Sequence, residues 1–208
     1  PRYPRGCRYT APTSLGSGSF GEVIKATDTL TQSTVAIKKV ANIWDHAAYH
    51  YPLAKRTYRE LNILRLAAGN HRNKVLRFLS VFSPPTDGSH RHSTLYIVTE
   101  YTNATLKNIL KAQHLPESSI QYIGYQITVG LQYLHSAGIV HRDLKPENII
   151  VFTDAARLMY AKIIDFGASR HDGSAFLFAA CFVCFWQAYR RFSRGMDASH
   201  CASGGGAG

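Results

Sequence analysis

The sequence predicts an α+β fold, in which short strands dominate the first half of the chain and its clearest helix follows. Residues 9–40 and 75–101 contain runs rich in Val, Ile and Thr between turn residues, which is typical of strands. Residues 53–68 and 116–136 instead repeat apolar side chains at helical spacing. The chain has 208 residues with 45% apolar and 18% charged content, which is enough for one or two globular domains.

The individual strands are short and are separated by turns. They are expected at 22–26, 34–40, 75–82, 94–100, 149–151 and 162–164.

The helix expected at 53–68 carries a carboxylate inside its apolar stripe. The stripe consists of Leu53, Leu61, Leu64, Ala67 and Ala68. Glu60 lies among them, and burying a carboxylate is costly unless a cation accompanies it. Lys38 and Lys39 are neighbours on a strand and therefore face opposite ways, so one of them points inward and can pair with Glu60.

The helix expected at 116–136 has recognisable ends. Pro116 and Glu117 suit its first turn, and Gly138 suits its end. Its buried seam is expected to be Ile120, Ile123, Ile127, Leu131 and Leu134.

The net charge of +11 favours anionic partners, although no long block of Lys and Arg is present. Scattered, solvated charges are therefore the simpler interpretation. The four cysteines are Cys7, Cys181, Cys184 and Cys201, a distribution that excludes a disulfide framework and fits a reducing compartment.

One motif in the first part of the chain suggests phosphate binding. Residues 16–21 form a G-x-G-x-x-G turn between strands, where glycines let the backbone close over phosphates. A plain glycine hairpin explains this turn equally well on its own. The next strand contains Val35-Ala36-Ile37-Lys38, and a single lysine on a strand is usually an exposed charge at the edge.

The strongest segment is His-Arg-Asp-Leu-Lys-Pro-Glu-Asn at 141–148, between two apolar strands. Asp165-Phe166-Gly167 follows the second of these strands and brings another carboxylate to the same edge. Asn148 and Asp165 supply hard oxygen ligands that suit Mg²⁺. Asp143 can accept a hydrogen bond from an incoming hydroxyl.

Taken in order, these motifs resemble the eukaryotic protein kinases: glycine loop, Val-Ala-Ile-Lys, helix Glu, His-Arg-Asp…Asn and Asp-Phe-Gly. The resemblance covers about 9–170. It implies a two-lobed kinase-like fold with a complete β-rich N-lobe and hinge at 1–103 and an incomplete helical C-lobe at 104–171.

The resemblance also assigns roles to single residues. Lys38 is expected to hold the α- and β-phosphates of ATP and to pair with Glu60. Asp143 is expected to orient the substrate hydroxyl and accept its proton, and Lys145 to steady the γ-phosphate. Asn148 and Asp165 are expected to hold two Mg²⁺ ions. The expected nucleotide-binding residues are Leu15, Gly16, Ser17, Gly18, Ser19, Phe20, Gly21, Glu22, Val23, Ala36, Lys38, Thr99 and Glu100.

A narrower resemblance is to the mitogen-activated protein kinases, especially the stress-activated branch. The similar stretches are 54–61, 95–100 and 135–143. The chain departs from that group at Glu147, where the group usually carries Ser, and at 168–170, where it usually has Leu-Ala-Arg.

The tail at 172–208 is expected to be unrelated to this fold and to be disordered or poorly packed. It lacks Lys and ends in a glycine-rich stretch, so a foreign sequence such as a retained intron or a shifted frame is the simplest account. One alternative is a membrane-surface segment, because 175–186 is apolar. Another is a zinc site formed by Cys181, Cys184, His200 and Cys201.

The function implied is that of an ATP- and Mg²⁺-dependent protein serine/threonine kinase of mitogen-activated type. Its expected partners are protein substrates and an upstream activating kinase, without nucleic acid or membrane, in the cytoplasm and also the nucleus. Neither Thr-x-Tyr nor Ala-Pro-Glu follows Gly167, so this chain is expected to transfer phosphate slowly or not at all. The alternatives are a non-catalytic nucleotide-binding fragment and a module that binds nucleic acid or membranes through its positive charge.

Overall fold

The structure of the chain is a computed structural model. It describes residues 8–18, 21–43, 52–67, 74–83, 94–102, 104–112, 115–153 and 158–171. The chain divides into two compact units. Unit 1 comprises Pro1–Asn103 together with Asp165–Gly167, and unit 2 comprises Ala104–Ile164 together with Ala168–Gly208.

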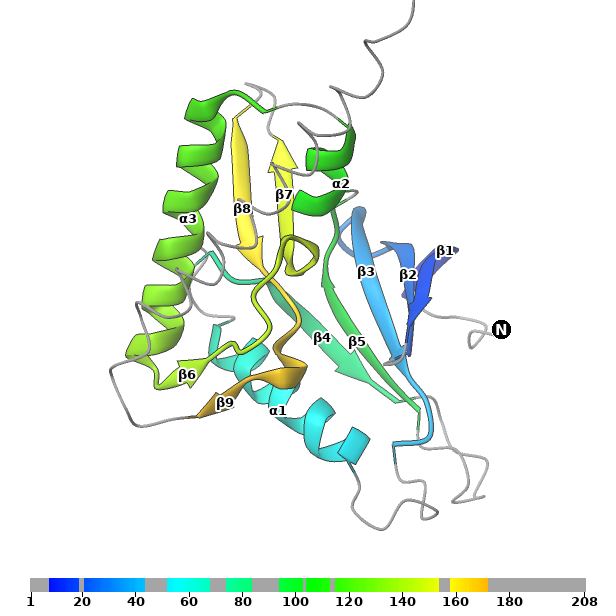
Figure 1. Ribbon diagram of the computed structural model, residues 1–208. Helices are drawn as coiled ribbons and strands as arrows, with labels where there is room; N and C mark the ends of the chain where they lie inside the picture. Colours follow the sequence, from blue (N-terminus) through cyan, green and yellow to red (C-terminus); the bar gives the residue numbers. More distant parts are fainter. Residues whose placement is uncertain are drawn as a thin grey trace, which may run out of the picture. The chain divides into compact units, whose positions relative to one another are not determined.

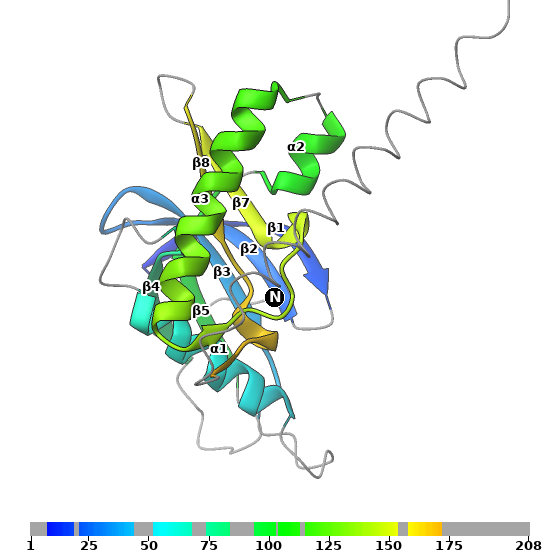
Figure 2. The same cartoon turned by 60° about the vertical axis from the view of Figure 1, so that its left-hand side comes forward.

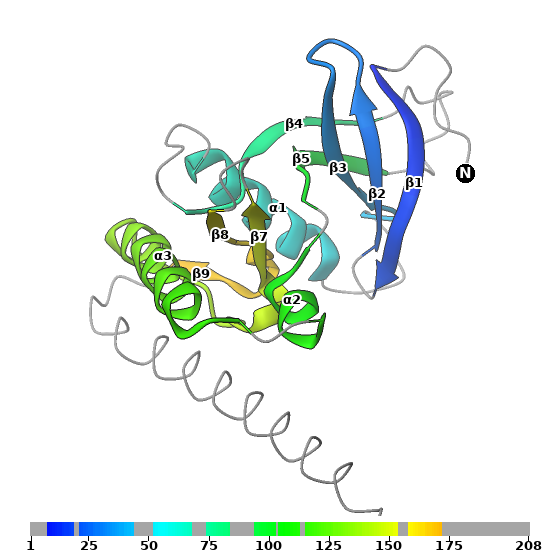
Figure 3. The ribbon, with the colours of Figure 1, turned by 90° about the horizontal axis from the view of Figure 1, so that it is seen from above.

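Unit 1 contains a five-stranded antiparallel sheet with the order β1-β2-β3-β5-β4 (Figure 1). Its strands are β1 (Tyr9–Gly18), β2 (Gly21–Asp28), β3 (Ser33–Val40), β4 (Phe78–Phe82) and β5 (Leu95–Glu100). Seen from above, β1, β2 and β3 lie side by side (Figure 3). The strands expected at 22–26, 34–40 and 94–100 are confirmed, whereas β4 begins three residues later than the 75–82 prediction.

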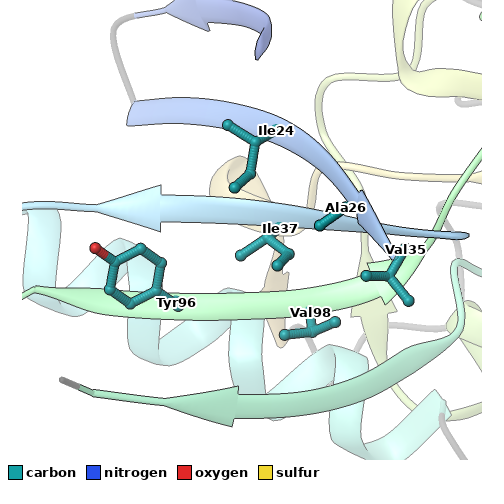
Figure 4. Packing of buried hydrophobic residues seen from close by; sticks show 6 residues of the cluster. All are labelled: Ile24, Ala26, Val35, Ile37, Tyr96 and Val98. Carbon is teal, nitrogen blue, oxygen red and sulfur yellow. The ribbon is translucent and has the colours of Figure 1, made fainter. Parts of the chain in front are cut away.

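One face of this sheet carries the apolar core cluster shown in Figure 4, which consists of Ile24, Ala26, Val35, Ile37, Tyr96 and Val98. The ring of Tyr9 stacks on Phe82 and that of Phe82 on Tyr96, so aromatic side chains join β1, β4 and β5. Because side chains alternate along a strand, Ala36 and Lys38 lie on the opposite face.

The helix expected at 53–68 is confirmed as α1 (Pro52–Ala67). Leu64 and Ala67 are buried as expected, while Leu53 and Leu61 are half-buried and Ala68 lies outside the described residues.

The helical part of unit 2 consists of α2 (Leu106–Ala112) and α3 (Glu117–Ser136). The structure confirms the helix expected at 116–136, with four of its five seam residues buried and Ile120 half-buried. Gly138 has φ 69° and donates its N–H to the carbonyl of His135 at 2.9 Å, which ends the helix as expected. Helix α2 is not among the elements that the sequence pattern predicts.

The strands of unit 2 form two small antiparallel pairs. β7 (Ile149–Thr153) pairs with β8 (Met159–Ile163), and β6 (Ile139–Val140) pairs with β9 (Arg170–His171). β7 agrees with the strand expected at 149–151, and β8 is shifted from 162–164 toward the N-terminus. Helix α3 runs alongside β8 (Figure 2).

A buried glutamine joins α3 to β8. Gln126 is only 1% exposed, and its side-chain amide donates to the Met159 carbonyl at 2.9 Å and accepts the Ala161 N–H at 3.2 Å. The side-chain amide thus makes two of the hydrogen bonds that a neighbouring strand would make with β8.

The tail at 172–208 lies outside the described residues, so the expectations for it stay predictions. None of the described helices combines the length and the apolar character needed to cross a membrane.

Candidate active site

Unit 1 holds a close ion pair between β3 and α1. Lys38 Nζ lies 2.7 Å from both carboxylate oxygens of Glu60. The Glu60 side chain is 9% exposed and that of Lys38 22%, so the carboxylate is buried with its counter-ion. The expectation that one of two adjacent lysines pairs with Glu60 is confirmed, and the partner is Lys38.

Several of the predicted nucleotide-binding residues share the sheet face of Lys38. Across the β2–β3 pair Val23 lies opposite Lys38, and across the β1–β2 pair Gly16 lies opposite Val23. Thr99 on β5 lies opposite Ala36. Strand pairing therefore brings together residues that are far apart in the sequence, on the face turned away from the core cluster.

The glycine motif forms a tight connection between β1 and β2. Gly18 pairs with Gly21, and the two residues between them, Ser19 and Phe20, lie outside the described part of the chain. Gly21 has φ 123°, and a β-carbon there would collide with the backbone carbonyl of Lys39. This position therefore requires glycine for both conformation and space.

Two other predicted nucleotide-binding residues, Glu22 and Glu100, pair with Lys39 and Val35 and therefore alternate onto the face of the core cluster. Leu15 is 47% exposed. The Glu100 carboxylate accepts the Arg77 N–H at 2.7 Å, which ties the end of β5 to the residue before β4.

Unit 2 holds the His-Arg-Asp loop. Lys145 Nζ lies 3.0 and 2.9 Å from the two carboxylate oxygens of Asp143. Asn148 Nδ2 donates to the backbone carbonyl of Asp143 at 2.8 Å and to its Oδ2 at 3.0 Å. The structure thus brings Asp143, Lys145 and Asn148 into one hydrogen-bonded cluster.

His141 anchors this loop from a fully buried position. Its Nδ1 accepts the Asp143 N–H at 3.3 Å, so the proton of the neutral ring belongs on Nε2, which donates to the Ile164 carbonyl at 2.9 Å. The Ser169 hydroxyl donates to the His141 carbonyl at 3.2 Å. Arg142, between the anchor and Asp143, has φ 68°, a left-handed conformation that costs a non-glycine residue about 1–3 kcal/mol.

Asp165 belongs to unit 1, where it too has a left-handed backbone, with φ 62°. Its Oδ1 accepts the Gly167 N–H at 3.3 Å and lies 3.9 Å from Arg56 Nη2 on α1. Phe166, between Asp165 and Gly167 in the sequence, is fully buried. Backbone strain thus occurs within both polar segments that the sequence singles out.

Comparison with known proteins agrees with this geometry. The family model described as the protein kinase domain matches residues 9–183. The chain belongs to the protein kinase family. Because the match extends past residue 171, the predicted boundary there stays a prediction.

Among curated proteins, this kinase chain is similar to mitogen-activated protein kinases. It is 42% identical to mitogen-activated protein kinase 14 of Xenopus laevis, over 79% of this chain and 42% of the relative. It is 44% identical to mitogen-activated protein kinase p38a of Drosophila melanogaster, over 75% and 40% of the two chains. It is 38% identical to the stress-activated protein kinase JNK of Drosophila melanogaster, over 82% of this chain and 42% of the relative. The chain thus spans about two fifths of the length of these relatives.

The electrostatics of the kinase loop favour an ionised Asp143. Partial burial raises the pKa of this carboxyl, but hydrogen bonds from Lys145 and Asn148 and the charge of Lys145 together outweigh burial. The pKa of Asp143 therefore lies below its ordinary value, and the group is a carboxylate at neutral pH.

The donor atoms of Asn148 and Asp165 fit a hard cation. Because Asn148 Nδ2 is committed to Asp143, its amide oxygen is the atom left for a metal. Within the described residues, Asp165 Oδ2 accepts no hydrogen bond. The two residues belong to different units, so a joint metal site stays a prediction.

Glu147, where the chain departs from the mitogen-activated group, makes a contact that the sequence pattern does not predict. Its carboxylate pairs with Lys107 on α2 at 2.7 Å. The hydrogen bond from Lys107 lowers the pKa of Glu147. Because α2 itself was not foreseen, the sequence offered no signal for this partner.

Proposed function

We propose that the chain binds ATP with Mg²⁺, and that its protein is a serine/threonine kinase of mitogen-activated type that phosphorylates other proteins. The observation that carries the proposal is the hydrogen-bonded cluster around Asp143, in a chain whose family is the protein kinases. Its partners are protein substrates and an upstream activating kinase. The family membership and the similarity to mitogen-activated kinases support these roles.

In unit 1, Lys38 is the cation for the nucleotide phosphates. Its pairing with both oxygens of Glu60 holds the ammonium group on the sheet face of Val23 and Ala36. The glycines that end β1 and begin β2 allow the backbone to approach phosphates and to offer them its N–H groups. These features position a triphosphate without forming a covalent bond to it.

In unit 2, Asp143 orients the hydroxyl of a serine or threonine by accepting its hydrogen bond. The hydroxyl oxygen forms a bond to the γ-phosphorus, the bond from that phosphorus to the β–γ bridging oxygen breaks, and ADP leaves. The hydroxyl proton passes to Asp143. Because its lowered pKa makes this carboxylate a weak base, the proton moves late, once the attacking oxygen has become acidic.

Charge neutralisation completes the proposed chemistry. Lys145, which already contacts Asp143, stabilises negative charge on the transferred phosphoryl group. Asn148 Oδ1 and Asp165 Oδ2 would hold Mg²⁺, which supplies electrostatic stabilisation of the phosphate oxygens when bound.

The test is transfer of radiolabelled γ-phosphate from ATP to myelin basic protein by the purified chain. We expect transfer that depends on the carboxylate of Asp143. Asp143→Asn should lower that rate by about 100-fold or more. Glu147→Gln is the matched control, since it makes the same change at a partly exposed carboxylate in the same loop. Equal rates for the two variants would contradict the role of Asp143.

A second candidate is a nucleotide-binding chain without catalysis. The ion pair of Lys38 and Glu60 favours it, because the pair lies wholly within unit 1 and does not depend on unit 2. An ATP–Mg²⁺-dependent rise in melting temperature without any transfer would support this candidate. Transfer at about 1–100 s⁻¹, the usual range for kinases, would exclude it.

A further inference from the structure

Helix α1 carries two charged side chains with different partners. Arg56 and Glu60 are four residues apart, so they lie on the same side of the helix, one turn from each other. Glu60 binds Lys38, and Arg56 approaches the Asp165–Gly167 segment, which belongs to the same unit. One helix therefore contacts both the lysine proposed for phosphate binding and the carboxylate proposed for metal binding.

Arg56 contacts this segment in two independent ways. Its Nη2 lies 3.9 Å from Asp165 Oδ1, and both side chains are about a quarter exposed, at 26% and 27%. Its guanidinium also fills the space beside Gly167, where an added β-carbon would collide with Arg56 Nε. The guanidinium is thus held against the carboxylate by charge and by fit.

The position of Arg56 bears on metal binding. A positive charge about 4 Å from a carboxylate lowers the gain from bringing a second cation to that carboxylate. A divalent ion on Asp165 Oδ2 would meet this guanidinium charge across the carboxyl group. Partial exposure weakens the repulsion without removing it.

We propose that Arg56 is a counter-ion of Asp165 that competes with the divalent cation and so sets the metal affinity of this kinase. Arg56 acts through Asp165 and is a positioning residue. The inference rests on the proposed function, because it takes Asp165 as the metal ligand. Gly167 has no side chain, and this leaves the space that the Arg56 guanidinium occupies beside Asp165.

The experiment measures the dissociation constant of the full chain for Mn²⁺ alone, by electron paramagnetic resonance of the free ion at low ionic strength. Arg56→Gln should tighten Mn²⁺ binding by about threefold to tenfold, with a smaller gain in high salt. Arg65→Gln, which removes an exposed arginine from the last turn of α1, should leave the constant within about twofold. An unchanged or weaker affinity in Arg56→Gln overturns the inference.

A second variant tests the same contact without removing the charge. Gly167→Ala should displace the guanidinium and tighten Mn²⁺ binding in the parent chain, but should add nothing to Arg56→Gln. Additive effects would show that the two residues act separately and would overturn the inference.

Asp165→Asn distinguishes this inference from the proposed function. Loss of Mn²⁺ binding in that variant, with no effect of Arg56→Gln, refutes only the competition. Retained binding in Asp165→Asn refutes the metal site itself, and so does an absence of Mn²⁺ binding in every variant. Melting temperatures measured alongside should change little in Arg56→Gln, because the pair is partly exposed.

Discussion

The link between Gln126 and β8 gives a prediction whose size follows from the structure. Replacing Gln126 with Leu removes one hydrogen bond to the Met159 carbonyl and one from the Ala161 N–H. Gln126 is 1% exposed and Ala161 is fully buried, so water cannot readily replace the lost partners. The buried Ala161 N–H left unsatisfied costs about 1–3 kcal/mol, and the lost bond to the carbonyl of half-buried Met159 costs about 1 kcal/mol, so the loss should be about 2–4 kcal/mol. That is a large part of the 5–15 kcal/mol typical of a domain.

Gln126→Glu sharpens the prediction because it adds a pH dependence. One carboxyl oxygen can still accept the Ala161 N–H, but the other must carry a proton to donate to Met159. Burial raises the pKa of a carboxyl in the folded state above its unfolded value of about 4.3. The folded state then binds the proton more tightly, so its stability relative to the parent is greatest near pH 4 and falls as the pH rises.

The assay is urea unfolding followed by circular dichroism, at pH 4.5 and pH 7.5, for the parent chain and both variants. Gln132→Leu and Gln132→Glu are the matched controls, since Gln132 is exposed on the same helix. The reasoning is refuted if the Gln126 and Gln132 variants lose the same free energy of unfolding. It is also refuted if Gln126→Glu shows no extra loss at the higher pH.

Two further predictions concern the Arg8–Asp28 pair and the glycines at positions 21 and 124. Hydrogen bonds from Arg8 lower the pKa of Asp28 in the folded state to about 2. The stability that this pair contributes is therefore complete above the pKa of Asp28 in the unfolded chain and disappears as the pH falls toward 2. In Asp28→Asn the melting temperature should depend less on pH across that range. Gly21→Ala should destabilise the fold by about 1 kcal/mol or more, because residue 21 has φ 123° and its new β-carbon would collide with the Lys39 carbonyl. Gly124→Ala in α3 should instead stabilise the fold by about 0.5–1 kcal/mol, because the added β-carbon would meet no neighbouring atom within 4 Å. Thermal melts of both glycine variants check this, and equal shifts would contradict it.

Periodicity explains why much of the fold could be predicted from the sequence. The helices at α1 and α3 and the strands β2, β3 and β5 repeat apolar side chains over several turns or alternations. The partner of Glu60 was also predictable, because a buried carboxylate requires a cation and adjacent strand lysines face opposite ways.

Other features depend on contacts between distant segments and gave no local signal. Helix α2 has only seven residues, too few for a clear period, and the partner of Glu147 was missed with it. The β6–β9 pair has two residues in each strand. The contact of Arg56 with Gly167 was missed because it joins a helix to a segment more than a hundred residues away.

The central claim is that Lys38, held by Glu60, binds the phosphates of ATP. Calorimetric titration with ATP–Mg²⁺ tests this claim most directly. It compares the double variant Lys38→Met/Glu60→Gln with the single variant Lys39→Met. The double variant removes both partners of the ion pair, so that no buried charge is left unpaired. Lys39 is the neighbouring lysine on the opposite face of β3. We predict that the first variant binds at least about tenfold more weakly, since a charge-assisted hydrogen bond is lost, and that Lys39→Met binds like the parent. Equal affinities for the two variants would contradict the account.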